Sequence, residues 1–207
     1  MKFIKNKKTV SFLASGRGSN FSAVARKIFD KEINAKLGIL ICDKSDAKAL
    51  SVAKEEFKMN SHFVDPKSYF SKIEFEEEMV KLLKQANTDL VVTAGYMRIL
   101  SSYFVSEFKN RIINIHPALL PSFPGLNAQK QAFDYGVKVT GCTSHFIDEG
   151  IDTGPIIMQA PVRIYNNDLL SDVSARILAE EHKILPESVK LFCEDKLSVV
   201  GRTVVIK

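Results

Sequence analysis

The segment INIHPALLPSFPG, residues 113–125, places two polar side chains on one face of a predicted strand. Side chains alternate along a strand, so Asn114 and His116 share one face, opposite the isoleucines. An unpartnered polar group in a sheet covered on both faces costs about 1–3 kcal/mol. The pair also falls at the carboxyl end of its strand, where open α/β sheets place their ligands. We therefore expect a ligand site here, with bonds to neighbouring loop backbone as the structural alternative.

A second group of polar residues surrounds the glycine-rich connection in CTSHFIDEGIDTGPII, namely His145, Asp148, Glu149 and Asp152. A loop between two buried strands can bring Asp152 against His116. A nearby carboxylate raises the pKa of an imidazole and fixes its orientation. A zinc or iron site made by His116, His145 and Asp152 is an alternative, but no local ligand spacing such as HxxxH supports it. We expect no metal and assign His145 a structural role.

Asn114, His116 and Asp152 together suit acyl transfer to an amine without a covalent intermediate. The chain has no GxSxG motif, and no cysteine stands beside a histidine. An amide and a protonated imidazole can both donate to the oxyanion of a tetrahedral intermediate, and losing one such donor costs on the order of 100- to 1000-fold in rate. The aspartate would keep the imidazole charged and help to relay protons from the attacking amine to the leaving nitrogen.

The motif SGRGSNF follows the first predicted strand and opens a helix. Its glycines allow close backbone approach, and Ser19 and Asn20 add polar side chains at the helix start. Together with the helix dipole they form a cradle for one phosphate, with a tight turn and a Ser or Asn N-cap as the structural alternative. A dinucleotide motif would need a third glycine where the chain has Phe21, and Asp43 would be its ribose-binding acid. A nicotinamide-dependent oxidoreductase therefore stays open, with the missing glycine against it.

The hydrophobic periodicity predicts a Rossmann-like α/β fold: a mostly parallel twisted sheet flanked by helices, with antiparallel strands added in the carboxyl-terminal half. In the first half, strands are expected at residues 8–14, 35–43, 62–65, 88–95 and 111–116, with helices at 19–31, 46–57, 70–87 and 101–110. In the second half, strands are expected at 137–149, 154–164, 197–200 and 203–207, with helices at 126–135 and 168–195. Pro186 should interrupt or kink the last helix.

The composition is that of one soluble α/β domain over residues 1–207. No apolar run is long enough to cross a bilayer, and the start is expected to be a core strand behind a solvated lysine-rich lead-in. Three scattered cysteines, Cys42, Cys142 and Cys193, favour the reducing cytoplasm over a disulfide framework. A net charge of +5, spread along the chain, suits an anionic small molecule and only weakly suggests nucleic acid.

The motifs SGRGSNF, AGYMRIL, NIHPALLPSFPG, SHFIDEGIDTGPII and AEEHKILP have the order and spacing seen in one family. The chain resembles the phosphoribosylglycinamide formyltransferases, a branch of the folate-dependent formyltransferases, over nearly its whole length. The resemblance implies formyl transfer from the co-substrate 10-formyltetrahydrofolate to glycinamide ribonucleotide in purine biosynthesis. It implies no nucleic-acid or membrane partner and leaves a homodimer open. It also implies a phosphate-binding half, residues 1–110, and a catalytic and folate-binding half, residues 111–207.

The resemblance also implies roles for particular residues. The catalytic residues are Asn114, His116 and Asp152; the ribonucleotide is held by Gly18, Ser19, Asn20 and Glu181; the folate is held by Lys72, Met97, Arg98, Ile99, Leu100 and Asn114. Two positions depart from the family. Leu178 stands where a polar or basic residue often lies near the phosphate, and we expect Arg17 to supply that charge. Lys72 replaces an arginine and so loses bidentate carboxylate geometry.

Three alternatives stay open beside this expectation. A formyltetrahydrofolate deformylase would pass the formyl group to water with the same residues, although its extra amino-terminal domain is not seen here. A methionyl-tRNA formyltransferase would need a basic carboxyl-terminal domain. The nicotinamide-dependent oxidoreductase would bind its cofactor without binding folate.

Overall fold

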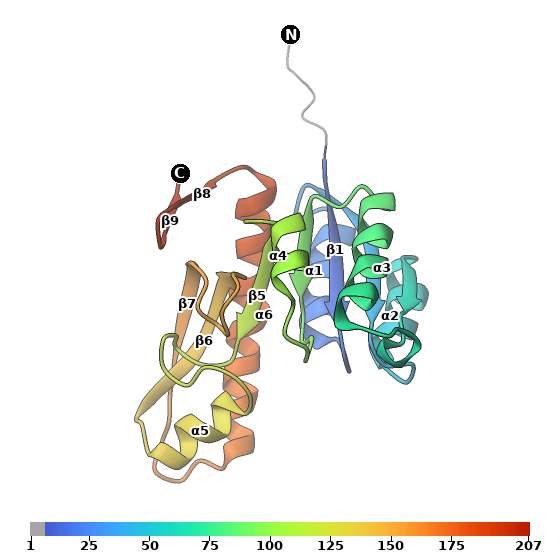
Figure 1. Cartoon of the computed structure of the whole chain (residues 1–207). Helices are drawn as coiled ribbons and strands as arrows, with labels where there is room; N and C mark the ends of the chain where they lie inside the picture. Colours follow the sequence, from blue (N-terminus) through green and yellow to red (C-terminus); the bar gives the residue numbers. More distant parts are fainter. Residues whose placement is uncertain (1–6) are drawn as a thin grey trace.

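The structure, a computed structural model, describes residues 7–207 (Figure 1). The first lysines of the expected lead-in lie outside these residues. None of the helices within residues 7–207 combines the length and the apolar character needed to span a membrane.

Nine strands in the described part of the chain form one sheet, in the order β3-β2-β1-β4-β5-β6-β7-β9-β8. Their bounds are β1 Lys8–Ala14, β2 Ala35–Cys42, β3 Asn60–Phe63, β4 Leu90–Thr93, β5 Ile112–His116, β6 Val139–Phe146, β7 Ile156–Arg163, β8 Leu197–Val200 and β9 Thr203–Ile206. The strands from β3 to β5 are parallel, β6 pairs antiparallel with β5, and β7 pairs antiparallel with β6. The predicted fold class is confirmed, and one sheet connects both halves of the sequence.

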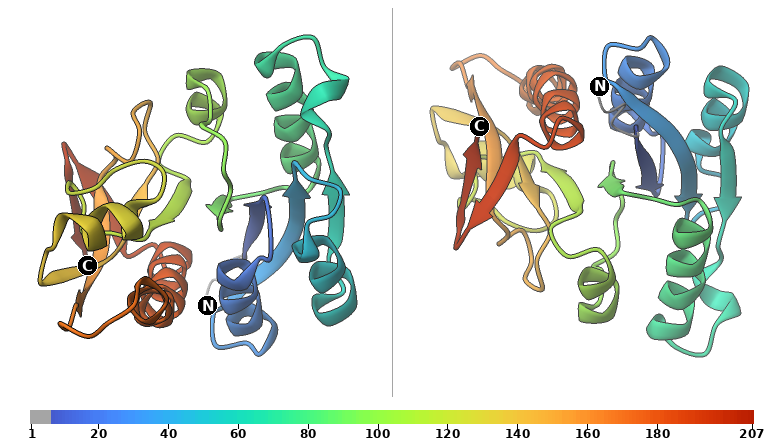
Figure 2. Two further views of the ribbon diagram at one scale, coloured as in Figure 1. Left: turned by 90° about the horizontal axis from the view of Figure 1, so that it is seen from below. Right: turned by 90° about the horizontal axis from the view of Figure 1, so that it is seen from above.

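Helices cover both faces of this sheet. The helices are α1 Ser19–Phe29, α2 Lys48–Phe57, α3 Lys72–Gln85, α4 Ser102–Glu107, α5 Ala128–Tyr135 and α6 Leu170–Cys193, with a 3₁₀ turn η1 at Pro66–Ser68. Figure 2 shows α3 and α4 on one face and α1, α2 and α6 on the other. In the strand order β3-β2-β1-β4-β5, the chain adds β2 and β3 on one side of β1 and then β4 and β5 on the other side. The switch point between β1 and β4 is where open α/β sheets form a ligand crevice.

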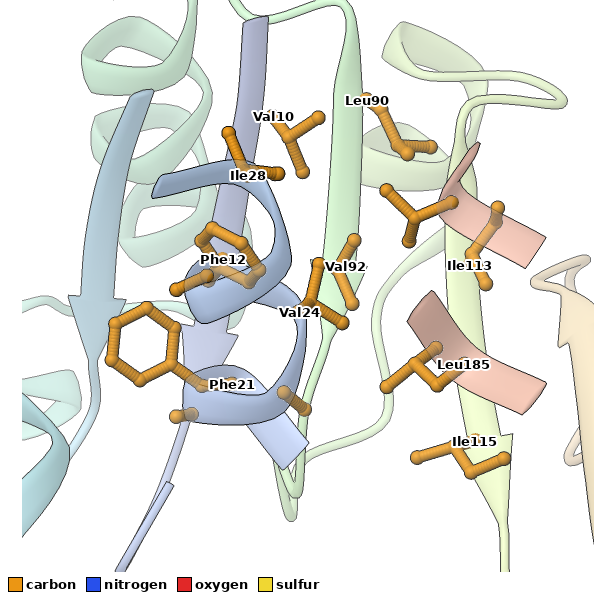
Figure 3. Close-up of a cluster of buried hydrophobic side chains, with 14 of the residues drawn as sticks. Val10, Phe12, Phe21, Val24, Ile28, Leu90, Val92, Ile113, Ile115 and Leu185 are labelled. Atoms are coloured by element: carbon orange, nitrogen blue, oxygen red, sulfur yellow. The ribbon is translucent and has the colours of Figure 1, made fainter. Parts of the chain in front are cut away.

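Alternating side chains of the central strands supply the two cores. Val10, Phe12, Ile113 and Ile115 pack with α1 and α6 (Figure 3), whereas Leu13, Val91 and Ile112 pack with α3 and α4. The rings of Phe12 and Phe21 meet edge to face with centroids 4.9 Å apart. Phe21 thus fills the place where a dinucleotide motif has its third glycine, because helix α1 packs on β1 through an aromatic ring.

Most elements are a few residues shorter than expected, and two differences have a clear physical reason. Strand β3 begins at Asn60, two residues before the predicted start, because an edge strand with one paired side tolerates the polar Asn60 and Ser61. Helix α6 continues through Pro186, so of the predicted interruption or kink the interruption is wrong. Leu185 and Val189 are fully buried against the sheet, and their packing holds the helix on both sides of the proline.

Candidate active site

A cavity of about 460 Å³ lies at the carboxyl ends of β4 and β5. It is lined by residues 95–100, 114–117, 125–127 and 150–152, together with Thr93, His145, Ile147 and Asp148. Met97 and Ile99 leave 62% and 58% of their surface exposed, so apolar area at the cavity is available to a ligand. All of the predicted catalytic residues and the predicted 97–100 segment meet here.

His116 lies between two hydrogen-bond acceptors. Its Nδ1 is 3.2 Å from Oδ2 of Asp152, and its Nε2 is 2.8 Å from the carbonyl oxygen of Phe123. The same oxygen of Asp152 accepts a bond from the backbone N–H of Gly125 at 2.8 Å. The loop after β5 and the loop after β6 therefore hold the imidazole from both sides, as the sequence predicted for Asp152.

The side-chain amide of Asn114 has a fixed orientation. The hydroxyl of Thr93, on β4, donates to its Oδ1 at 2.7 Å, and its Nδ2 lies 3.1 Å from Nε2 of His145. Asn114 and His145 are paired residues of β5 and β6, which explains how an antiparallel register brings them together. The amide N–H groups consequently face the interior of the site.

His145 belongs to this cluster, although the sequence suggested only a structural role. Its Nδ1 lies 2.9 Å from the carbonyl oxygen of Phe146 and therefore carries the hydrogen in that bond. Its Nε2 lies 3.6 Å from Oδ1 of Asp152. The alternation of side chains along the strands could have predicted this contact, because paired residues of neighbouring strands β5 and β6 point to the same face of the sheet.

Burial controls the ionisation of His116. Burial lowers the pKa of this imidazole, and neither the bond to Phe123 nor the charge of Asp152, which both raise the pKa, offsets that effect. The carboxylate acts in the expected direction, but the net direction is the opposite of the one we expected. His116 is 4% exposed, so loss of hydration outweighs the ion pair. The two facing acceptors offset this effect only in part, so His116 gives up its proton more readily than a free imidazole does.

Asp152 is a carboxylate in this environment. Burial alone would raise its pKa, but the close approach of His145, the bond from the backbone N–H of Gly125 and the nearby histidine charges hold the pKa below its usual value. Its backbone has φ 54°, and Phe123 on the other side of His116 has the same φ. Two non-glycine residues in the left-handed region flank one imidazole, which is a pattern of strain that concentrates at functional sites.

The glycine-rich turn lies beside the cavity. The hydroxyl of Ser15 accepts a bond from the backbone N–H of Met97 at 3.0 Å, which joins the loops after β1 and β4. Gly18 has φ 76° and begins α1, and a Cβ there would lie 2.7 Å from Cβ of Ala49. Only glycine fits this turn, which brings α1 and α2 close together and leaves the first N–H groups of α1 without a side-chain cap.

Asn20 and Glu181 meet at this turn. Nδ2 of Asn20 donates to Glu181 at 2.7 Å, from α1 to α6. Burial raises the pKa of Glu181, and the bond from Asn20 lowers it in part. Oδ1 of Asn20 is buried and has no hydrogen-bond partner within residues 7–207. The two predicted ribonucleotide residues, far apart in the chain, therefore form one polar group next to Gly18.

Comparison with known proteins adds the family. Residues 8–189 match the family model described as formyl transferase. The chain is 42% identical to phosphoribosylglycinamide formyltransferase of Bacillus subtilis (strain 168), over 88% of this chain and 93% of that protein. The crystal structure of glycinamide ribonucleotide transformylase 1 from Symbiobacterium toebii superposes with a TM-score of 0.96 at 41% identity, covering 100% of this chain and 97% of that one.

The chain belongs to the formyl transferase family. A formyltetrahydrofolate deformylase from Pseudomonas syringae shares the fold with a TM-score of 0.89, but at 29% identity, and the present chain covers 66% of it. The deformylase alternative is thus the more distant one. The nicotinamide-dependent alternative has no support in this formyl transferase, because Asp43 lies buried with its Oδ2 4.0 Å from Arg98.

The predicted folate-binding residues 97–100 and Asn114 line the cavity, whereas six predicted binding residues do not: Arg17, Gly18, Ser19, Asn20, Lys72 and Glu181. Lys72 begins α3, and its Nζ is 4.0 Å from Glu76 with about half of the side chain exposed. Arg17 is exposed in the glycine-rich turn and makes no ion pair within residues 7–207. Their predicted contacts stay predictions.

The residues considered for a metal contact one another directly in this formyl transferase. His116 and His145 both approach Asp152 at hydrogen-bond distances or slightly beyond. Within residues 7–207, no group of three or more His, Cys, Asp or Glu side chains is arranged to hold a metal ion.

Proposed function

We propose that this formyl transferase moves the formyl group of 10-formyltetrahydrofolate to the amine of glycinamide ribonucleotide, a step of purine biosynthesis. The observation that carries the proposal is the convergence of Asn114, His116 and Asp152 on one cavity in a chain similar to phosphoribosylglycinamide formyltransferases. In this reaction a bond forms between the amine nitrogen and the formyl carbon. The bond from that carbon to N10 of the folate breaks, and one proton passes from the amine to N10.

The cavity supplies donors for the tetrahedral intermediate. Asn114 and His116 both line the cavity from a single strand. Asn114 keeps one amide N–H beyond its contact with His145, and His116 would donate from Nε2 once a formyl oxygen replaces the carbonyl oxygen of Phe123. Because Thr93 and His145 fix the amide of Asn114, no reorganisation of that donor is needed as negative charge develops. The hydrogen bonds from both donors are then stronger in the transition state than in the ground state, and this difference lowers the barrier.

Asp152 and His116 supply the path for the proton. An imidazole whose pKa is lowered by burial releases its proton readily, which suits a group that delivers a proton to the leaving nitrogen. Asp152 stabilises the charged ring while the proton is held and orients Nδ1 through the contact of 3.2 Å. We assign Asp152 this role rather than a role as nucleophile.

The protonation of the cysteine thiols favours direct transfer of the formyl group, without a covalent enzyme intermediate. Burial raises the pKa of Cys42, Cys142 and Cys193 to about 12 in each case, so these thiols stay protonated near neutral pH. None of the three lines the cavity. A covalent thioester intermediate therefore has no candidate nucleophile among the cysteines, and attack by the substrate amine is the simpler reaction.

The two substrates would enter from different sides. The pterin ring of the donor suits the backbone and apolar side chains of the 97–100 segment, and Lys72 would approach the outer part of the folate. The phosphate suits the open start of α1 at Gly18, Ser19 and Asn20, with Glu181 on the ribose hydroxyls. The expected division into a phosphate-binding half, residues 1–110, and a catalytic and folate-binding half, residues 111–207, does not separate these residues, because segment 97–100 and Lys72 lie in the first half and Glu181 lies in the second. We propose that both halves contribute to both substrate sites within one domain.

The test uses 10-formyl-5,8-dideazafolate and glycinamide ribonucleotide, with absorbance of the deformylated folate as the signal. We expect product only when the ribonucleotide is present, in an amount equal to the formylated ribonucleotide. Equal release of product without the ribonucleotide would show a deformylase. No product under either condition would contradict the proposed function altogether.

A further inference from the structure

An acidic side chain that takes no part in the chemistry described above is buried beneath the cavity wall. Glu76 lies on the inner face of α3 and is 1% exposed, between Phe75 and Met79, which belong to the core under α3. A carboxylate in such a place is unfavourable unless its oxygens are bonded. The contacts of Glu76 therefore indicate what it does.

Both oxygens of Glu76 bond to Ser101. The backbone N–H of Ser101 donates to Oε1 at 3.0 Å and to Oε2 at 3.3 Å, and the hydroxyl of Ser101 donates to Oε2. Lys72 approaches Oε1 from the exposed side at 4.0 Å. Ser101 directly follows Leu100, which is the last residue of the cavity-lining segment 95–100.

Segment 95–100 is an irregular segment that packs on the core under α3 through Tyr96 and Leu100. It forms neither helix nor strand, and its side chains at Met97 and Ile99 are mostly exposed. Its first part is bonded to the loop after β1, through Met97 and Ser15. Its middle has the longer contact of Arg98 with Asp43 at 4.0 Å. The bonds from Ser101 to Glu76 fix its far end.

We infer that Glu76 is a positioning residue for the formyl donor: it fixes the end of segment 95–100 through Ser101 and so sets the shape of the cavity wall. This inference rests on the proposed function, because it assigns the donor to that wall. Glu76 touches no substrate. Its loss should weaken binding of the donor and leave the ribonucleotide site at Gly18 unchanged, since that turn has its own contacts with α2 and α6.

The test compares Glu76→Met, Glu76→Gln and the wild-type enzyme. Methionine keeps the volume and the helix but accepts no strong bond, so the fold should survive while Ser101 is released. Displacement of a binding surface by about 1 Å can cost on the order of 100-fold, and we expect KM for 10-formyl-5,8-dideazafolate to rise about 10- to 100-fold. Glutamine keeps one acceptor and should restore KM in part. The neighbouring exposed Glu77→Met is the matched control.

Kinetics separate this role from a general loss of structure. Support requires a raised KM for the donor with KM for the ribonucleotide unchanged, and faster amide hydrogen exchange at residues 95–101 than in the Glu77→Met control. An unchanged donor KM in folded Glu76→Met, or an equal rise of both KM values, overturns the inference. If Glu76→Met does not fold, Ser101→Ala removes the hydroxyl bond, together with the N-cap of α4, but keeps the backbone bonds to Glu76, so a smaller rise of KM for the donor alone is expected. If the wild-type enzyme transfers no formyl group, the proposed function is contradicted. The amide hydrogen exchange at residues 95–101 then still tests whether Glu76 fixes this segment.

Discussion

The two walls of the cavity are built in different ways. The wall formed by β5, β6 and their loops presents buried polar side chains, each of which is fixed by a neighbour: Asn114 by Thr93, and His116 by Asp152 and Phe123. The second wall, segment 95–100, presents backbone and exposed apolar side chains. We infer that the first wall carries out the chemistry and the second holds the donor. Changes in the first should alter kcat, and changes in the second should alter KM for the donor.

The largest effect is expected at the first wall. Asp152→Asn keeps the shape and the bond from Gly125 but removes the charge beside His116, so kcat should fall on the order of 100- to 1000-fold. His116→Ala should be at least as severe. Both should bind glycinamide ribonucleotide as the wild type does, measured by isothermal titration calorimetry.

The control for this pair is Glu149→Gln. Glu149 lies in the same loop as Asp152 but is exposed and does not line the cavity. It should keep the wild-type kcat. Retention of activity in either Asp152→Asn or His116→Ala would contradict the roles assigned to the first wall.

The second wall should respond in KM. Ile99→Ala removes methyl and methylene groups that the donor is expected to cover, and each such group is worth about 0.8 kcal/mol when buried. We expect KM for the folate donor to rise about tenfold, with kcat and thermal stability unchanged because Ile99 is exposed in the free enzyme. Val205→Ala, an exposed apolar residue on β9, is the control. If kcat fell instead of KM rising, the two walls would not divide the work as we infer.

The fold was largely predictable, because its local signals and its packing agree. The hydrophobic periodicity predicted the helices and strands of the first half. The polar residues Asn114 and His116 at the end of β5 predicted where the cavity lies. Asn114, His116 and Asp152 were found because strand alternation and strand ends follow from backbone geometry alone.

The remaining features depend on packing that the sequence does not encode locally. Glu76 lies in an acidic run that suggests an exposed helix face, although its spacing from Met79 puts it on the inner side of α3. The pKa of His116 depends on how much protein surrounds it, so its charged neighbour alone gave the wrong direction. Pro186 is tolerated within α6 because buried neighbours hold the helix, which local propensity does not describe.

Ionisation offers a third way to distinguish the walls, since only the first contains a buried imidazole. Because the folded-state pKa of His116 lies below its ordinary value of 6.5, the unfolded chain binds more protons between these two values. The free energy of unfolding should therefore fall as the pH falls below about 6.5. His116→Gln should reduce this slope, measured by urea unfolding between about pH 5 and pH 7.5. An unchanged slope would mean that His116 does not titrate in that window.

The smallest effect is expected outside both walls, at Arg17. This guanidinium is exposed in the glycine-rich turn beside Gly18, where it can approach a phosphate bound at the start of α1. Because water and salt screen an exposed charge, Arg17→Ala should raise KM for glycinamide ribonucleotide only a few-fold. Added salt should reduce the difference between the variant and the wild type. KM for the folate donor should not change. Lys54→Ala, which removes an exposed positive charge from α2, controls for net charge. Equal affinity of Arg17→Ala and the wild type for the ribonucleotide at low salt would contradict the hypothesis that Arg17 supplies the positive charge missing at position 178, where this chain has Leu178.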